Sequence, residues 1–419
     1  MNKFKKYDSY KDSGLEWLGE IPSEWEVKRF NDLFKVSQGL QIIRSERTDS
    51  PKTNSVEYIT LPSIKGTIKE YIYKPTKNVL CNKNDFLVVR TGSGVGQIIT
   101  NVKGAFHNNF FKVGINKKLD RKYIYNLLTA HYVKSLMKIY AGITAIPDLN
   151  HSEFYSIELA LPPLKTQQKI ASYLDTQTQK IDKEIELLEQ KSEKYKELKQ
   201  TLINERVLRG LDEGVKLKDS GIEWIGDIPE GWSIERIGLA FNERRTKVND
   251  TEYPPLSVTR NGIVPQLENV AKTIHNDNRR LVKKGDYVIN SRSDRRGSSG
   301  IANKDGSVSV INIVLEPKKA FFGKYLHHLF RSFSFIEEYY RNGTGIVYDL
   351  WTTKYSLMRT IEFSFPSYEE QQKIATYLDE KTGKIDDINA KIKDKITLLK
   401  AFRKTLINDV VTGKVKICD

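Results

Sequence analysis

Two phrases of this sequence each occur twice, about 200 residues apart, and this repetition limits the possible folds more than any other feature. Residues 12–22 (DSGLEWLGEIP) return as residues 219–229 (DSGIEWIGDIP), and residues 167–175 (QQKIASYLD) return as residues 371–379 (QQKIATYLD). Between these matched ends the two copies differ strongly. Repeats of about 200 residues are domain-sized and far too long for a solenoid unit. The chain is therefore predicted to be a pseudo-two-fold molecule in which one frame holds two divergent inserts.

Two segments carry an apolar residue at every seventh position, which is typical of coiled-coil helices. The first ladder is Leu174, Ile181, Leu188, Tyr195 and Leu202, and the second is Leu378, Ile385, Ile392, Leu399 and Leu406. Further apolar residues lie near the intervening positions, namely Ile185, Leu198, Ile388, Ile396 and Phe402. Gly210 and Gly413 follow the two segments as expected C-caps. Equal length and register favour pairing of the two helices with each other over two separate amphipathic surface helices.

The inserts are predicted to mix short strands with helices. Sequence patterns predict three strands and one helix in the first copy, at residues 58–61, 85–90, 110–113 and 122–136. Two of these elements recur in the second copy, where residues 286–289 match the second strand and residues 324–329 match the helix. The inserts are therefore diverged copies of one domain that carry different loops.

The net charge of the chain is +15, and residues 61–122 alone hold 12 basic and 3 acidic residues. A basic balance favours a polyanionic partner, with nucleic acid ahead of a membrane surface, and a merely solvated basic surface is the alternative. Cys81 and Cys418 are too few for a disulfide framework or a four-ligand zinc site. No stretch approaches the ~18 apolar residues of a membrane-spanning helix. We therefore expect a cytoplasmic protein without a membrane partner.

Basic residues follow equivalent strands in the two inserts. The second copy has RSDRRGSSG at residues 292–300, and the first has RTGS at residues 90–93, nearly the same place. In DNA complexes Arg reads guanine, Asn and Gln read adenine, and Lys, Ser and Thr contact phosphates. The candidate DNA contacts are Lys65, Arg90, Thr91, Ser93, Arg279, Arg280, Arg292, Ser293, Arg295 and Arg296. The alternative for these arginines is a structural ion pair with Asp294 or Asp85.

The sequence contains no recognisable motif for catalysis or cofactor binding. Residues 92–96 (GSGVG) are rich in glycine, but the Lys-Ser/Thr of a phosphate-binding loop does not follow them. His327 and His328 are adjacent, so on a helix they face different directions and cannot readily share a metal ion. We therefore expect no catalytic residue, no metal site and no cofactor in this chain. A self-sufficient nuclease or methylase is the alternative that activity of the purified chain alone would support.

Several motifs together carry a resemblance to a known family. They are residues 161–171 (LPPLKTQQKIA), residues 365–375 (FPSYEEQQKIA), residues 142–149 (GITAIPDL) and the repeated DSGxEWxGxIP phrase. The chain resembles, over essentially its whole length, the specificity (S) subunit of type I restriction–modification systems. The second copy departs from the pattern, because residues 343–350 (GTGIVYDL) replace the GITAIPDL form.

The resemblance implies an α+β fold with a pseudo-two-fold repeat. Two diverged α/β target recognition domains would be separated by two long helices that form an antiparallel coiled coil. The corresponding segments are residues 1–157 for the first domain, 158–210 for the central helix, 211–362 for the second domain and 363–419 for the C-terminal helix. Each domain would read one half of a bipartite, asymmetric target in double-stranded DNA, and the coiled coil would set the spacer between the halves.

The resemblance also implies partners. Two methyltransferase subunits would dock on the frame, and two motor–nuclease (restriction) subunits would complete the complex. S-adenosylmethionine, ATP and magnesium would belong to those partners, and this chain would be non-catalytic. The main competing hypothesis is a coiled-coil scaffold whose basic domains bind RNA or an acidic protein.

Overall fold

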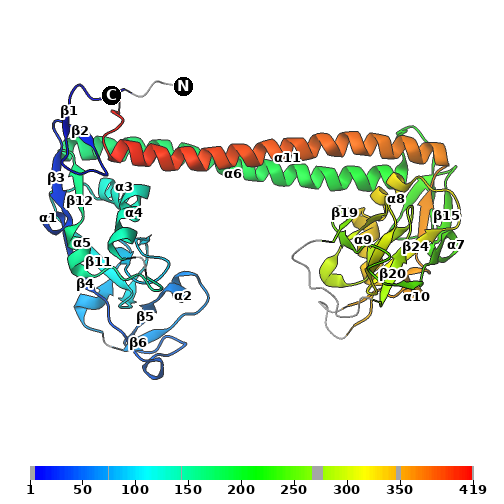
Figure 1. Cartoon of the computed structure of the whole chain (residues 1–419), viewed down its shortest axis with the longest axis horizontal. Coiled ribbons are helices and arrows are strands. Elements are labelled where there is room, and N and C mark those ends of the chain that lie inside the picture. The colour runs from blue at the N-terminus through cyan, green and yellow to red at the C-terminus, as the bar shows by residue number, and fades with distance from the viewer. Residues whose placement is uncertain (1–4, 74, 143, 267–276, 346–350, 418–419) are drawn as a thin grey trace. The chain divides into compact units, whose positions relative to one another are not determined.

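The computed structural model describes residues 5–73, 75–142, 144–266, 277–345 and 351–417, so part of the departing motif at 343–350 lies outside the described residues. The chain divides into two compact units. Unit 1 consists of residues 1–187 and 394–419, and unit 2 consists of residues 188–393. Each unit mixes strands with helices and takes one part of the long helices α6 (Leu164–Arg209) and α11 (Tyr368–Val411), as Figure 1 shows. The predicted α+β class with two related domains is confirmed.

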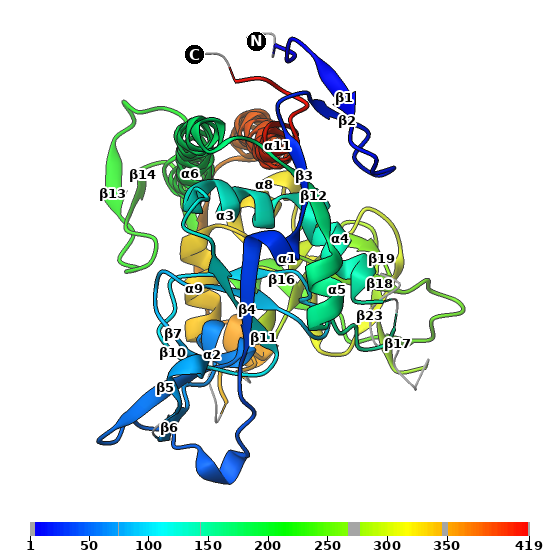
Figure 2. The same ribbon diagram turned by 90° about the vertical axis from the view of Figure 1, so that its left-hand side faces the viewer.

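Helices α6 and α11 contain 46 and 44 residues and run side by side (Figures 1 and 2). The helices are antiparallel, because residue numbers along α11 decrease from one cross-helix contact to the next as residue numbers along α6 increase. The cross-helix pairs are Asp182–Arg403 and Glu184–Lys395 in unit 1, and Ser192–Asn389 and Lys199–Asp386 in unit 2. A glycine with a φ of 76° follows each helix, Gly210 directly after α6 and Gly413 after Thr412 at the end of α11, as expected of left-handed C-caps.

The predicted heptad residues lie along the seam between the helices. Leu174, Ile181, Leu378, Ile385, Ile392 and Leu406 are buried, and Leu188, Tyr195, Leu202 and Leu399 are half-buried. Leu198 and Phe402, which lie near the intervening positions in the sequence, are by contrast 52% and 44% exposed. Each precedes by one residue the position that faces the partner helix, which is occupied by Lys199 and Arg403.

Unit 1 contains a hairpin, a two-stranded ladder and two four-stranded sheets. The hairpin and ladder are β1 (Tyr10–Asp12) with β2 (Glu20–Pro22), and β3 (Glu26–Arg29) with β12 (Glu158–Leu161). The first sheet has the order β4 (Phe34–Gln38), β11 (Phe110–Ile115), β8 (Phe86–Val89), β9 (Ile98–Ile99). The second has the order β6 (Tyr71–Tyr73), β5 (Ser55–Ile59), β10 (Gly104–Phe106), β7 (Leu80–Cys81).

The helices of unit 1 are short apart from its part of the long pair. They are α1 (Phe30–Leu33), α2 (Leu61–Ile64), α3 (Arg121–Thr129), α4 (His131–Tyr140) and α5 (His151–Ser156), with 3-10 turns η1 (Arg44–Glu46) and η2 (Lys77–Val79). The single helix predicted at 122–136 is two helices, because the extended backbone of Ala130 (ψ 143°) separates α3 from α4. The predicted strand at 58–61 ends at Ile59, and Leu61 begins α2.

Unit 2 repeats part of this plan and alters the rest. The repeated parts are hairpin β13 (Leu217–Asp219) with β14 (Asp227–Pro229), ladder β15 (Ser233–Arg236) with β25 (Glu362–Phe365), and sheet β16 (Phe241–Glu243), β24 (Asn312–Pro317), β21 (Tyr287–Asn290), β22 (Ser299–Ile301). The altered parts are sheet β17 (Lys247–Val248), β20 (Arg279–Val282), β23 (Gly306–Ser309) and hairpin β18 (Leu256–Thr259) with β19 (Gly262–Pro265). The remaining helices are α7 (Ile237–Ala240), α8 (Gly323–Leu329), α9 (Phe333–Arg341), α10 (Tyr355–Met358) and the turn η3 (Ser293–Arg295).

The repeated QQKIA phrase attaches each domain to the start of its long helix. The buried Gln167 accepts a hydrogen bond from the Asp120 backbone N–H (2.9 Å) and donates one to the Pro162 carbonyl (2.8 Å). Gln371 makes the same two contacts in unit 2, with Phe322 (2.9 Å) and Pro366 (3.0 Å). Buried backbone groups need such partners, so the repeated glutamine has a structural role.

The repeated DSGxEWxGxIP phrase is the sequence of one β-hairpin. Asp12 accepts a hydrogen bond from the Gly14 N–H, and Asp219 accepts one from the Gly221 N–H, both at 2.9 Å. Both glycines have a φ of 71°, which L side chains rarely adopt. Figure 2 shows the two resulting hairpins, β1–β2 and β13–β14.

Candidate nucleic-acid interface

In each unit a cleft is bordered by the turn that connects the two sheets. In unit 1 the turn between β10 and β11 contributes His107 and Asn109 to a cleft of about 380 Å³. In unit 2 the equivalent turn, between β23 and β24, contributes Val310 and Ile311 to a cleft of about 530 Å³. We call these the unit 1 cleft and the unit 2 cleft. One pair of equivalent residues, Asn109 and Ile311, lines the two clefts, and the other lining residues differ in position as well as in chemistry.

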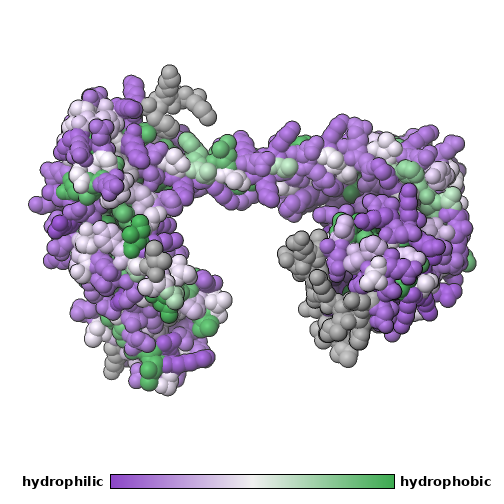
Figure 3. Space-filling model, viewed as in Figure 1, coloured by the Kyte–Doolittle hydropathy of each residue, from purple (hydrophilic) through white to green (hydrophobic). Residues whose placement is uncertain are grey.

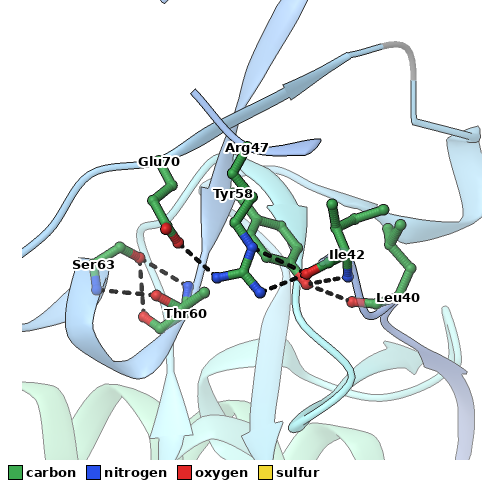
Figure 4. Close-up of polar contacts among 7 residues, drawn as sticks. All are labelled: Leu40, Ile42, Arg47, Tyr58, Thr60, Ser63 and Glu70. Atoms are coloured by element: carbon green, nitrogen blue, oxygen red, sulfur yellow. Dashed lines mark hydrogen bonds and ion pairs between the residues drawn. The ribbon is translucent and has the colours of Figure 1, made fainter. Parts of the chain in front are cut away.

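The wall of the unit 1 cleft is held by Arg47, which Figure 4 shows among its partners. Its guanidinium pairs with Glu70 (2.9 Å), donates to the Ile42 carbonyl (Nε, 3.0 Å) and lies over the Tyr58 ring, 5.0 Å from its centroid. The Tyr58 hydroxyl in turn donates to the Leu40 carbonyl at 2.8 Å. These bonds fix the segment around residues 40–47, so the side chains it carries are preorganised.

His107 and helix α2 complete the unit 1 cleft. Burial and the nearby Arg47 cation lower the pKa of His107, so a neutral imidazole faces the cleft at pH 7. The Thr60 and Ser63 side chains cap α2 reciprocally, as Figure 4 also shows. The candidate Lys65 follows as the C-cap of this helix and is exposed.

The loop after β8 is bound to the GITAIPDL segment. Arg90 forms a bidentate ion pair with Asp148 (2.8 Å) and lies over the Phe111 ring. Backbone hydrogen bonds join Leu149 to Arg90 and Gly92 to Pro147, both at 2.9 Å. The Arg90 side chain is only 15% exposed, so it has the structural role considered above, with Asp148 as its partner in place of Asp85. Of the neighbouring candidates, Thr91 is half-buried and Ser93 is exposed.

The equivalent loop of unit 2 keeps its arginines at the surface. Arg292 and Arg295 share the Asp294 carboxylate at 3.0 and 3.6 Å, and their side chains are 44% and 68% exposed. The expected alternative, an ion pair with Asp294, is therefore present without burying either guanidinium. Arg296 pairs with Glu337 at 3.2 Å and lies 5.2 Å from the Tyr340 ring centroid. Ser293 is buried.

The two adjacent candidates on β20 point in opposite directions, as successive strand residues do. Arg280 faces the unit 2 cleft and pairs with Glu243 (2.5 Å), which also holds Arg245 (2.6 Å). Arg279 is 4% exposed and donates hydrogen bonds to the hydroxyl (2.8 Å) and carbonyl (3.1 Å) of Ser307. The Arg279 side chain therefore lies inside unit 2, and its role as a candidate DNA contact stays a prediction.

Sequence reasoning missed several residues that line the two clefts. They are Arg245, Val310, Ile311 and Lys354 in unit 2, and Arg44, His107 and Asn109 in unit 1. The repeat could have indicated the turn residues. Strands β11 and β24 begin 202 positions apart, so the residues just before them occupy equivalent positions in the two copies. The unit 2 cleft is strongly basic, with Arg245, Arg280, Arg292 and Lys354 set against one carboxylate, Glu243.

Among the described residues, no three His, Cys, Asp or Glu side chains gather in a way that could hold a metal ion. Within this same part of the chain, no helix is both long enough and apolar enough to cross a membrane.

Comparison with known proteins identifies related sequences. Residues 22–194 and 231–398 each match the family described as "Type I restriction modification DNA specificity domain". The putative type I restriction enzyme MjaX specificity subunit of Methanocaldococcus jannaschii is 25% identical over 459 residues, covering 99% of this chain and 98% of the relative. The MjaVIII specificity subunit of the same organism is 27% identical over 241 residues, covering 56% of this chain. The match spans about half of that relative's length (52%).

Solved structures share the fold. One, described as the structural basis of complex assembly and conformational transition of the type I R-M system, has a TM-score of 0.69 at 15% identity and covers 93% of this chain and 98% of its own. The HsdS subunit from Thermoanaerobacter tengcongensis has a TM-score of 0.55 at 15% identity, with coverage of 94% and 98%. At such identities the likeness concerns the fold alone.

The two family matches fall on the two copies of the repeat, and each contains one of the two clefts. The resemblance seen in the sequence motifs is thereby confirmed. The chain belongs to the family of type I restriction modification DNA specificity domains.

Proposed function

We propose that this chain is the DNA-recognition subunit of a type I restriction–modification complex, in which each unit reads one half of a bipartite, asymmetric duplex target. The observation that carries the proposal is the pair of clefts. Both clefts border the turn at equivalent positions of the repeat, where unit 1 presents Asn109 and unit 2 presents Ile311, and the rest of each cleft is lined by different elements. Two equal frames with unlike recognition surfaces suit a target whose halves differ.

The charge of the unit 2 cleft supports duplex DNA as the ligand. Exposed arginines can read guanine or hold phosphates, and the hydroxyls of Thr352 and Ser356 on the cleft wall suit phosphate oxygens. Arg292 and Arg295 are the strongest candidates, because their guanidinium groups remain exposed while Asp294 orients them. Each phosphate contact that is removed should lower the salt dependence of binding by about one unit of slope.

The long helices are the proposed spacer element. Helix α6 continues for 46 residues, which corresponds to about 69 Å at 1.5 Å per residue. A seam of buried apolar residues stiffens the pair, and the Gln167 and Gln371 contacts bind each domain to it. We propose that this arrangement sets the number of unread base pairs between the half-sites.

Exposed apolar residues on the helices are proposed to dock the methyltransferase subunits. Leu198 and Phe402 are equivalent positions of the repeat, 204 residues apart, and both side chains are about half exposed. Figure 3 shows hydrophobic surface interrupting an otherwise mainly hydrophilic exterior. Exposed apolar surface often marks a protein interface. Because each unit has one such position, we propose that two copies of the methyltransferase subunit bind, one at each position. Two motor–nuclease subunits would then complete the complex.

Catalysis is proposed to belong to those partners, together with S-adenosylmethionine, ATP and magnesium. The docking proposal is tested by Leu198→Lys and Phe402→Lys, measured by the mass of the complex with the methyltransferase subunit. Each single variant should bind one copy in place of two, and the double variant none. Leu398→Lys is the control, because its equivalent in the other copy is already Lys194. Two bound copies in the double variant would place the docking surface elsewhere.

The recognition proposal is tested by selecting duplexes from a random pool with the full chain and its methyltransferase partner. We expect one motif with two defined halves and an undefined spacer, and binding that RNA and acidic protein do not compete away. Preferential binding of RNA or of an acidic protein would favour the scaffold hypothesis. Cleavage or methylation by the purified chain alone would contradict its non-catalytic role.

A further inference from the structure

In unit 1, two amide side chains are brought together at the turn between β10 and β11 that borders the cleft. Leu40 pairs with His107 in a parallel bridge, and the Asn108 N–H donates to the Leu40 carbonyl at 3.1 Å. The close approach requires Gly39, since a Cβ at that position would lie 2.3 Å from the His107 carbonyl oxygen. Gln41 and Asn108 therefore lie on adjacent, tightly joined segments.

The two amides are joined by a directed hydrogen bond. Asn108 Nδ2 donates to Gln41 Oε1 at 3.1 Å, and Gln41 is exposed. Asn108 Oδ1 is buried, and within the described part of the chain it has no hydrogen-bond partner. Leaving a buried acceptor unpaired is unfavourable, so this arrangement is not explained by local stability. The hydrogen bond from Asn108 fixes the orientation of the Gln41 amide at the surface.

We propose that Gln41 reads the major-groove edge of an adenine in the half-site bound by unit 1, and that Asn108 is the residue that positions it. This inference rests on the proposed function. Adenine presents a donor at N6 and an acceptor at N7, and a glutamine amide satisfies both at once. The bond from Asn108 occupies one lone pair of Gln41 Oε1, so the second lone pair can accept from N6 while Nε2 donates to N7.

The equivalent turn of unit 2 has apolar residues, Val310 and Ile311, in place of Asn108 and Asn109. Its Val310 and Ile311 are 39% and 42% exposed and carry no hydrogen-bonding group on their side chains. The adenine contact is therefore assigned to the unit 1 half-site alone. This restricts the position in the target at which Gln41 variants should act.

The test is duplex selection with the full chain, comparing the wild type with Gln41→Ala, Gln41→Glu and Asn108→Ala. Gln41→Ala should lose about 10- to 100-fold of the preference for adenine at one position, with the other half-site unchanged. Gln41→Glu should shift that preference toward cytosine, because a carboxylate accepts from cytosine N4. Asn108→Ala should give a smaller loss at the same position. Asn31→Ala, an exposed amide on α1, is the control and should change nothing.

The outcomes separate this inference from the function on which it rests. If the wild type selects a bipartite motif and both Gln41 variants keep every position of it, the adenine assignment is wrong and the function stands. A loss at a position that is not adenine overturns the assignment equally. If the wild type selects no motif, the proposed function itself fails. Thermal unfolding of each variant identifies any loss that is due to misfolding.

Discussion

Units 1 and 2 agree in the contacts that join each domain to the long helices and the helices to each other, and they differ in the residues that line the clefts. The glutamine contacts of Gln167 and Gln371 match, as do the ion pairs Lys122–Asp175 and Lys324–Asp379. Across the helices, Asp182–Arg403 in unit 1 corresponds to Asp386–Lys199 in unit 2. The cleft residues share nothing comparable. The repeated residues therefore serve the frame, whereas the proposed recognition surfaces consist of residues that are not repeated.

The second sheet of each unit marks the boundary between frame and variable part. One pairing is shared, because β10 pairs antiparallel with β7 in unit 1 and the equivalent β23 pairs antiparallel with β20 in unit 2. The other side of the strand differs, because β10 pairs in parallel with β5, whereas Ser307 of β23 forms an isolated parallel bridge with Pro255. The first sheet keeps one order in both units. The turn bordering each cleft joins these two sheets. The residues on the second-sheet side of the turn can therefore differ between the units while the first sheet keeps its strand order.

The largest effect is expected from the heptad seam, where Leu188 and Ile392 are equivalent positions of the repeat. Leu188→Asp together with Ile392→Asp would place carboxylates in the seam and should lower the free energy of unfolding by roughly 3–6 kcal/mol. Denaturant titration measures this loss. The control is Leu198→Asp with Leu398→Asp on the outer faces, where the wild-type side chains are 52% and 69% exposed. Equal losses in both pairs would show that the seam is not the stabilising element.

The next largest effect is expected in the pH dependence of stability, through His327 of unit 2. Burial, with Arg331 and His328 adding positive charge, lowers the pKa of His327 from 6.5 to about 4, and Arg331 donates to its ring at 2.6 Å. The folded state therefore prefers neutral His327. Its contribution, up to about 3 kcal/mol, is present above pH 6.5 and is lost as the pH falls toward 4.

The variant His327→Gln keeps an acceptor for Arg331 and removes the titration. We expect its stability to change less than that of the wild type between pH 6.5 and 4.5. The equivalent residue of unit 1 is Tyr125, so this histidine belongs to unit 2 alone. Identical pH profiles for the wild type and the variant would show that His327 is not held neutral by its surroundings. Nearby Asp379 and Lys199 are unchanged in this comparison.

The glutamine contacts should contribute equally in the two units. Gln167→Ala and Gln371→Ala each leave two backbone groups without a partner and should each cost about 1–3 kcal/mol. The neighbouring Gln168 and Gln372 are exposed, and their alanine variants serve as matched controls. Hydrogen exchange at the Asp120 and Phe322 amides would locate the loss in the correct unit. Markedly unequal losses would mean that the two attachments are not equivalent.

The smallest effect concerns one layer of the coiled coil. Ser192 and Asn389 share a hydrogen bond of 2.9 Å in unit 2, where unit 1 has Ile396 and Ile185 at the equivalent positions. Replacing both by isoleucine should be neutral or stabilise the chain by about 1 kcal/mol, whereas Ser192→Ile alone leaves Asn389 unpaired and should destabilise it by a similar amount. Thermal unfolding distinguishes these results, and a large loss in the double variant would show that the polar layer is required.

The frame was predictable because its signals are periodic or repeated. The heptad spacing indicated both helices, and Gly210 and Gly413 marked their ends. The clefts were not predictable in the same way, because their residues come from turns whose contacts are long-range. Arg90 illustrates this limit, since its partner Asp148 lies 58 positions away. Arg279 illustrates another, because only the pairing of β20 decides which of two adjacent arginines is buried.

The central claim is that each unit recognises one half-site independently of the other. The most direct test exchanges residues 20–155 for the corresponding domain of a relative and determines the methylated motif in cells that express the chimera with its methyltransferase partner. The account predicts that one half of the motif changes, while the other half and the spacer stay the same. A change in both halves together, or an unchanged motif, would contradict the assignment of one half-site to each unit.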